Sequence, residues 1–252
     1  MSTAPPSSTN GTQSLRRLLD LLDQFTSERP SHSVEELRHA IGVPRSTVYR
    51  LVSLLTAHEL LEQTPGNRYQ LGPRAITMGY VARSTVDLAD LWRPVLERLA
   101  TETSETTLVL RRIGESAVCV DRVECGHLVR LSFEIGRAMP LHTGAGAKVL
   151  LAYSSDVARE RYLAEAVPAP RRAGLRAELE RIRQQGWGES TAEVDPGIWA
   201  VAAPILVDRD RRCLAISVAL PEYRLQPDGR EHLRHVTVQG AAELRSKLAQ
   251  YA

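Results

Sequence analysis

Apolar residues near the N-terminus recur at helical spacing and predict three short helices in succession. One face of the first helix is predicted to carry Leu15, Leu18, Leu19, Leu22 and Phe25. The second helix begins at Ser33, because Ser33 and Glu36 stand at the spacing of a capping box, in which each side chain bonds the other residue's amide. Gly42 ends this helix, since glycine adopts the left-handed conformation at little cost.

The third helix starts near Pro44, whose fixed backbone angle suits a first helical turn. Its inward face is predicted to carry Val48, Leu51, Val52 and Leu55. Segments 60–63 and 68–71 are then predicted as two short strands joined by a turn at Pro65-Gly66. Three helices followed by a hairpin make a winged helix-turn-helix, a fold whose third helix usually enters the major groove of DNA.

The formal net charge is only +2, so a DNA-binding surface on this chain has to be a local one. Residues 43–56 supply such a surface, because they include Arg45 and Arg50 but no Asp or Glu. Arginine pairs with guanine edges or phosphates, and hydroxyl groups bind phosphates. We therefore predict DNA contacts by Arg45, Ser46, Thr47, Tyr49 and Arg50, with Arg68 on the hairpin reaching an adjacent phosphate. The alternative is that the three helices only mediate protein contacts.

Beyond the hairpin the pattern changes to a mixture of helices and strands. Residues 74–83 predict a linker helix, and a further helix follows from Leu88 with Pro94 as a kink or a new start. Runs of β-branched and apolar residues predict strands at 106–110, 117–123, 128–133, 199–207 and 213–220. A last helix carries Leu233, Val236, Leu244 and Leu248. The C-terminal half is therefore predicted as α+β, with a mostly antiparallel sheet covered by helices.

The segment His142–Lys148 is the strongest candidate for chemistry in the C-terminal half. Its glycine spacing is not that of a phosphate-binding P-loop, and Lys148 is followed by Val149 rather than by Ser or Thr. The chain also contains no G-x-S-x-G or H-E-x-x-H motif. We therefore predict binding without catalysis and assign no catalytic residue. The glycines suit a helix start whose free amides hold a carboxylate, and the alternative is a tight turn that needs small residues for packing.

Composition narrows the class of protein further. The chain has 252 residues, 43% of them apolar and 25% charged, and no apolar stretch approaches the roughly 20 residues of a membrane span. Residues 1–13 lack the features of a secretion signal and predict a mobile tail. Cys119, Cys125 and Cys213 are too few for a disulfide scaffold and favour a reduced, cytoplasmic protein. Cys125 and His127 lack a second pair at zinc-site spacing, so we predict neither a metal nor a cofactor.

Several motifs resemble those of the IclR family of bacterial transcriptional regulators. In the N-terminal half they are Glu36-Leu37, Ile41–Val52 and Arg68–Pro73. In the C-terminal half they are Gly136–Lys148, Gly186-Trp187, Glu193–Gly197 and Ala202–Ile205. The motifs occur in the family's order, and the resemblance covers the chain from Ser14 to the C-terminus.

The resemblance implies a regulator of a catabolic operon, with a winged helix-turn-helix at 14–72, a linker helix at 73–84 and a GAF-like effector-binding domain at 85–252. It also implies a homodimer, or a dimer of dimers, on a partly palindromic operator in double-stranded DNA. We expect the dimer contacts around Ile76, Tyr80 and Val81. Repressors and activators both occur in the family, and the residues leave this choice open.

The resemblance also implies an effector pocket. By position within the family's motifs, its walls are expected to include Leu131, Met139, Ala145, Gly146, Ser190, Ala200, Ser217 and Ala219. The amides near Ala145 and Gly146 and the hydroxyls of Ser190 and Ser217 are expected to hold a carboxylate.

Relatives that sense small keto acids tend to be more polar at these positions, where this chain has Ala200 and Ala219, and Ser190 in place of an acid. The resemblance therefore favours an aromatic or medium-sized organic acid as the effector over a two- or three-carbon acid. Two other classes of protein stay open: a metabolic enzyme with an accessory winged helix, and a protein-interaction scaffold.

Overall fold

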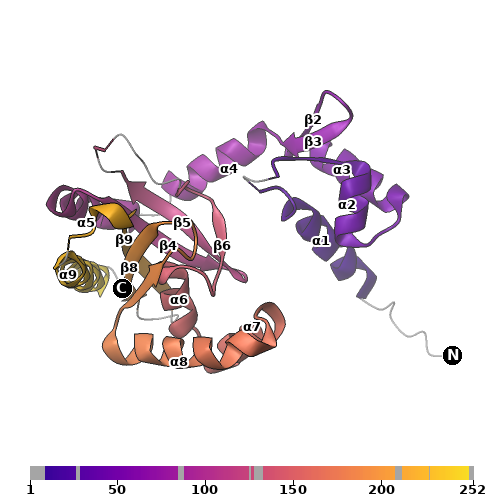
Figure 1. Ribbon diagram of the computed structural model, residues 1–252. Coiled ribbons are helices and arrows are strands. Elements are labelled where there is room, and N and C mark those ends of the chain that lie inside the picture. Colours follow the sequence, from indigo (N-terminus) through magenta and orange to yellow (C-terminus); the bar gives the residue numbers. More distant parts are fainter. Residues whose placement is uncertain are drawn as a thin grey trace. The chain divides into compact units, whose positions relative to one another are not determined.

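The chain divides into two compact units, Met1–Val86 and Asp87–Ala252. The computed structural model describes residues 9–26, 29–84, 88–124, 126–127, 133–207, 212–226 and 228–249 (Figure 1). Within these residues no helix is both long and apolar enough to cross a membrane. The finer domain boundaries expected from the sequence remain a prediction.

The first unit contains four helices and a small sheet in its described part. Its elements are α1 (Thr9–Leu22), β1 (Ser31–Ser33), α2 (Val34–Ile41), α3 (Arg45–Ala57), β2 (Leu61–Thr64), β3 (Arg68–Leu71) and α4 (Pro73–Ser84). The strands form an antiparallel sheet in the order β1-β3-β2. The predicted winged helix-turn-helix is therefore present, with β1 as an additional strand. The sequence did not predict β1, because three residues are too short to show the alternation of a strand.

The predicted helix signals around α2 are confirmed. Ser33 accepts a hydrogen bond from the Glu36 amide, and the Glu36 carboxylate accepts one from the Ser33 amide. Gly42 ends α2 in the left-handed conformation with φ 64°. At the base of the hairpin, Gly72 is required because a Cβ there would lie 2.3 Å from the Glu59 carbonyl oxygen.

The predicted buried face of α1 is partly wrong. Leu21, which the prediction omitted, is fully buried, whereas Leu15 and Leu19 are 66% and 60% exposed. Leu18 and Leu22 pack at the edge of the core, and Phe25 does so beyond the end of the helix. Leucines occupy both sides of α1, so periodicity alone does not select the side that packs against α2. The helix also begins at Thr9, inside the segment predicted as a mobile tail.

The second unit is built on one six-stranded antiparallel sheet in the order β6-β5-β4-β9-β8-β7. Its strands are β4 (Thr106–Ile113), β5 (Ser116–Val123), β6 (Ala138–Pro140), β7 (Gly188–Thr191), β8 (Ile198–Val207) and β9 (Arg212–Pro221). Its helices are α5 (Leu88–Thr103), α6 (Ala145–Ala152), α7 (Asp156–Ala166), α8 (Ala169–Gln185), the short η2 (Glu222–Arg224) and α9 (Gly229–Ala249). The predicted α+β class with a helix-covered antiparallel sheet is confirmed.

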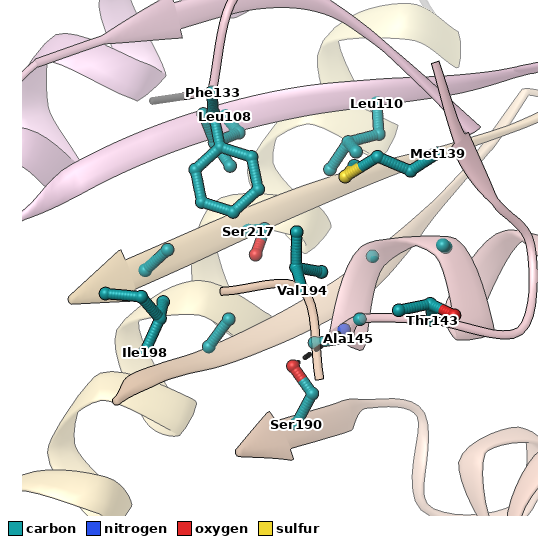
Figure 2. A pocket seen from close by; sticks show the side chains of 15 residues that line it. Leu108, Leu110, Phe133, Met139, Thr143, Ala145, Ser190, Val194, Ile198 and Ser217 are labelled. Carbon is teal, nitrogen blue, oxygen red and sulfur yellow. Dashed lines mark hydrogen bonds between the residues drawn. The ribbon is translucent and has the colours of Figure 1, made fainter. Parts of the chain in front are cut away.

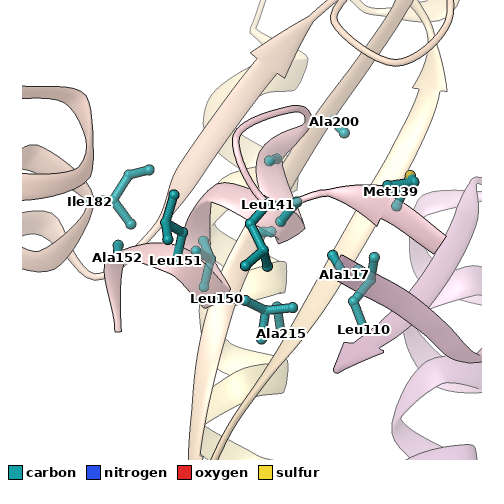
Figure 3. Close-up of a cluster of buried hydrophobic side chains, with 14 of the residues drawn as sticks. Leu110, Ala117, Met139, Leu141, Leu150, Leu151, Ala152, Ile182, Ala200 and Ala215 are labelled. Atoms are coloured by element: carbon teal, nitrogen blue, oxygen red, sulfur yellow. The ribbon is translucent and has the colours of Figure 1, made fainter. Parts of the chain in front are cut away.

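Helices cover both faces of this sheet (Figure 1). The α5–α9 pair lies on one face, and α6, backed by α7 and α8, lies on the other. Side chains alternate along β8 accordingly. Trp199 and Val201 pack in a hydrophobic cluster with Leu233 of α9. Ala200 and Ala202 pack in a second cluster with the apolar residues of α6, part of which Figure 3 shows. Strand alternation therefore decides which residues of β8 face α6.

Some predicted elements of the second unit differ from the structure. The expected strand at 128–133 lies outside the described residues except for Phe133. Pro94 lies within a continuous α5 instead of starting a new helix. Strands β6 and β7 were not predicted, because each is too short to show a period.

We expect Leu21→Ala to lower the free energy of unfolding by about 2–5 kcal/mol, because it leaves a cavity in the core of the first unit. The matched control is Leu54→Ala in α3, whose side chain is 48% exposed and should change stability by less than about 0.5 kcal/mol. Chemical denaturation followed by circular dichroism measures both values. Equal losses in the two variants would contradict the assigned register of α1.

Candidate functional site

Helix α3 presents a polar face to solvent at its N-terminal end. Arg45, Ser46, Tyr49 and Arg50 are exposed and Thr47 is half-buried, while Val48 and Leu51 pack inward. The first turn contains no acidic residue, and no side chain caps it. Its first two amides are therefore open to an anion such as a phosphate. The structure thus places all five predicted α3 residues together at one end of the helix.

The Arg45 and Tyr49 side chains form a pair one helical turn apart. The Arg45 guanidinium donates a hydrogen bond of 3.1 Å to the Tyr49 hydroxyl and lies 5.5 Å from the centre of its ring. Arg50 has no bonded partner in the part of the chain that the structure describes. The contact with Tyr49 restricts the guanidinium of Arg45, whereas the side chain of Arg50 is freer to change its conformation.

Arg68 lies at the start of β3, immediately after the turn, but its guanidinium points to β1. It donates to the Ser31 hydroxyl and the Ser31 carbonyl oxygen at 3.0 and 2.7 Å. It also forms an ion pair of 3.0 Å with Glu36, whose carboxylate closes the capping box of α2. A phosphate contact by Arg68 therefore has to compete with bonds that join the hairpin to β1 and α2.

The second unit contains a pocket between the sheet and the N-terminus of α6 (Figure 2). Seven of the eight predicted pocket residues line it: Met139, Ala145, Gly146, Ser190, Ala200, Ser217 and Ala219. The eighth, Leu131, lies outside the described residues. The remaining lining residues, which the sequence did not predict, are Leu108, Leu110, Phe133, Thr143, Gly144, Ala147, Val194 and Ile198. Most of them are ordinary apolar residues of strands and loops, so only the fold identifies them as pocket walls.

Polar groups line the α6 side of this pocket. The Ser190 hydroxyl accepts a hydrogen bond of 3.0 Å from the Ala145 amide, which leaves the hydroxyl proton available (Figure 2). The next two amides, of Gly146 and Ala147, belong to the first turn of α6 and have no acceptor among the described residues. This side of the pocket therefore offers hydrogen-bond donors to an anion.

Ser217 on β9 offers the opposite chemistry. Its hydroxyl lies 2.8 Å from the Val201 carbonyl oxygen. A carbonyl oxygen has no proton, so Ser217 is the donor and only its lone pairs remain for a ligand. With its proton directed at Val201, the Ser217 hydroxyl is placed to accept a hydrogen bond from a ligand, whereas the sequence led us to expect that it donates one to a carboxylate.

An ion cluster around the buried Lys148 lies next to the pocket and was not predicted. Lys148 on α6 is 1% exposed, and its ammonium lies 2.5 Å from both the Glu178 and the Glu193 carboxylates. The second oxygen of Glu193 accepts a hydrogen bond of 2.9 Å from the Gly144 amide. Lys148 was noted in the sequence because it ends the glycine-rich segment. Its partners lie far away in the sequence, so no local motif indicated the ion pairs.

The cysteines considered in the sequence analysis belong to no reactive or metal-binding site among the described residues. Burial raises the pKa of the Cys119 thiol to about 11 and that of the Cys213 thiol to about 12. Both therefore stay protonated near neutral pH and pack as small apolar groups. Cys125 lies outside the described residues, and the described residues contain no cluster of three or more potential metal ligands.

Comparison with known proteins identifies both units. The profile of the IclR helix-turn-helix domain matches residues 14–65. The profile described as bacterial transcriptional regulator IclR, C-terminal, matches residues 80–245. The HTH-type transcriptional regulator KipR of Bacillus subtilis is 26% identical over 95% of this chain and 98% of its own length.

Solved structures share the fold. An IclR family transcriptional regulator from Brucella abortus superposes with a TM-score of 0.84 at 22% identity, covering 98% of this chain and 97% of that chain. An IclR homologue from Microbacterium hydrocarbonoxydans, solved with 4-hydroxybenzoate, gives a TM-score of 0.72 at 18% identity and covers 94% of this chain and 99% of that one.

Proposed function

This chain belongs to the IclR family of bacterial transcriptional regulators, and from that premise we propose that α3 binds operator DNA under the control of a small organic acid bound beside α6. The observation that carries the proposal is the exposed, acid-free end of α3 with Arg45 and Arg50. The domain limits are those expected above, the target is a catabolic operon, and the regulator acts in the cytoplasm. The family and its relatives are regulators and not enzymes, so an enzymatic role is not favoured.

On DNA, we assign base contact to Arg45 and Arg50 and phosphate contact to Ser46, Thr47 and Tyr49. Tyr49 holds Arg45, and a fixed guanidinium loses less freedom when it pairs with a guanine edge. The open amides of the first turn attract a phosphate. Arg68 supports the wing and reaches a phosphate only through a donor left over from Ser31 and Glu36.

In the pocket, the chemistry favours an aromatic acid. The Gly146 and Ala147 amides and the Ser190 proton suit a carboxylate, and the apolar walls suit a ring. The Ser217 lone pairs can accept a hydrogen bond from a hydroxyl on the ring. A ligand with a carboxylate at one end and a hydroxyl at the other satisfies both, and 4-hydroxybenzoate, found in a relative, has this arrangement.

We further propose that the working form is a homodimer, or a dimer of dimers, assembled through the first unit. Helix α4 exposes its apolar side chains, with Ile76 at 77%, Tyr80 at 72% and Val81 at 50% exposure. Leu15 and Leu19 of α1 are further exposed apolar side chains of the first unit. Exposed apolar surface of this kind marks contact with another protein, and a two-fold axis matches a palindromic operator.

We expect Arg45→Ala and Arg50→Ala each to weaken binding to a DNA site selected from a random pool by about 1–3 kcal/mol if the arginine reads a guanine edge. Fluorescence anisotropy at several salt concentrations measures the effect, since loss of a phosphate contact flattens the salt dependence instead. An unchanged affinity in the double variant would remove α3 from the interface.

Arg68→Ala serves as the contrasting variant. It should lower the free energy of unfolding by about 1–2 kcal/mol through its bonds to Ser31 and Glu36. Arg50→Ala should leave stability unchanged.

For the dimer, we expect Tyr80→Glu together with Leu19→Glu to convert the protein to a monomer, because the substitutions place carboxylates in an apolar interface. Val157→Glu on α7, at a position 82% exposed in the second unit, is the matched control and should leave the dimer intact. Sedimentation velocity at micromolar concentration gives the answer. A monomeric wild-type protein that still binds DNA tightly would refute the assembly.

For the pocket, we expect 4-hydroxybenzoate to bind the full chain more tightly than benzoate, and pyruvate to bind weakly. Ser217→Ala should abolish the preference for the hydroxyl, a loss of about 0.5–1.5 kcal/mol, without changing benzoate affinity. Isothermal titration calorimetry measures both. Tight binding of pyruvate without response to aromatic acids would overturn the assigned ligand class.

A further inference from the structure

Glu193 bonds both Lys148 and the backbone of Gly144 through one carboxylate. One oxygen bonds the buried Lys148 ammonium at 2.5 Å, and the other accepts the Gly144 amide at 2.9 Å. Gly144 is the residue before α6 and lines the pocket. A carboxylate of the chain itself therefore already occupies a hydrogen-bond donor at the end of the pocket where an acid is expected to bind.

The segment that carries Glu193 also forms a wall of the pocket. Residues 192–197 connect β7 to β8, and the Ala192 amide donates to the Ile198 carbonyl oxygen at 2.8 Å, which closes the segment as a loop. Val194 lines the pocket and is packed so tightly that a Cβ at Gly144 would lie 2.8 Å from its side chain. Glu193 and Val194 are adjacent in this short loop, so a movement of the loop carries both.

The charges around Lys148 bear directly on an acidic ligand. One ammonium faces the two carboxylates of Glu178 and Glu193, so the cluster carries a formal charge of −1. Glu178 bonds the Lys148 ammonium from α8, and within the described residues its carboxylate accepts no hydrogen bond from a backbone amide at the start of α6. Of the two carboxylates, only Glu193 competes for the Gly144 amide.

We propose that Glu193 is an internal competitor of the effector. The carboxylate of the ligand takes over the Gly144 amide, Glu193 keeps only its bond to Lys148, and the 192–197 loop with Val194 moves away from the pocket. This inference rests on the proposed acid-binding function of the pocket and adds to it the group that sets its affinity and couples binding to a movement of the chain.

The test is calorimetry of the full chain with benzoate and with benzamide, its neutral counterpart. Glu193→Gln should tighten benzoate binding by roughly tenfold, because it removes a negative charge and weakens the competitor, and should leave benzamide unchanged. Glu178→Gln is the matched control: it changes the cluster charge from −1 to 0 in the same way but does not free the amide, so its gain should be clearly smaller.

The outcomes separate the two proposals. Equal gains from Glu193→Gln and Glu178→Gln, or weaker benzoate binding by Glu193→Gln, would overturn the competition while leaving the ligand class intact. An absence of benzoate binding in all three proteins would overturn the ligand class, and the competition with it.

Amide hydrogen exchange provides a second measurement that needs no ligand. In Glu193→Ala, exchange of the Gly144 amide and of residues 192–197 should rise roughly tenfold, whereas Glu178→Ala should leave both near the wild-type rate. Equal exchange in the two variants would contradict the role of Glu193, and retained helix content by circular dichroism excludes unfolding as the cause.

Discussion

The amides at the start of α6 impose the constraint on which the second unit depends. All residues of α6 are buried, so the first turn cannot rely on bulk water for its hydrogen bonds. Glu193 satisfies the Gly144 amide and Ser190 satisfies the Ala145 amide. These bonds hold β7 and the following loop against α6, and the amides of Gly146 and Ala147 remain for the pocket. The need to satisfy these amides therefore holds one wall of the pocket in place, and the two amides that stay unsatisfied within the described residues point to the pocket as hydrogen-bond donors.

Small residues allow this arrangement and also create the space. A Cβ at Gly146 would lie 2.5 Å from the Leu110 side chain, so a larger residue at that position would require Leu110 to shift. Across from it, Ala200 and Ala219 are paired neighbours on β8 and β9. Larger residues at these positions would fill the pocket with side chains. Close packing and the pocket thus come from the same choice of small residues.

The first unit divides its arginines between two tasks. Arg68 bonds Ser31 and Glu36 and thereby ties the hairpin to the helix-turn-helix, whereas Arg45 and Arg50 stand at the exposed end of α3. The residue type is the same, and the number of bonded neighbours distinguishes the roles. A nearly neutral chain presents a local basic surface because α3 itself contains no acid and the nearby Glu36 is paired with Arg68.

The sequence by itself determined the helix-turn-helix, because Ser33, Glu36 and Gly42 act within a few residues of themselves, and local signals of this kind can be seen in order along the chain. It also located seven of the pocket residues through family motifs, although most of the walls escaped it. Only the tertiary structure decided which face of α1 is buried, that Arg68 pairs with β1, and that the Ser217 hydroxyl donates its hydrogen bond to the Val201 carbonyl oxygen. It alone brought Glu178 and Glu193 to Lys148. These results depend on contacts between residues far apart in the chain, and no local periodicity or spacing specifies which distant partner a polar side chain will meet.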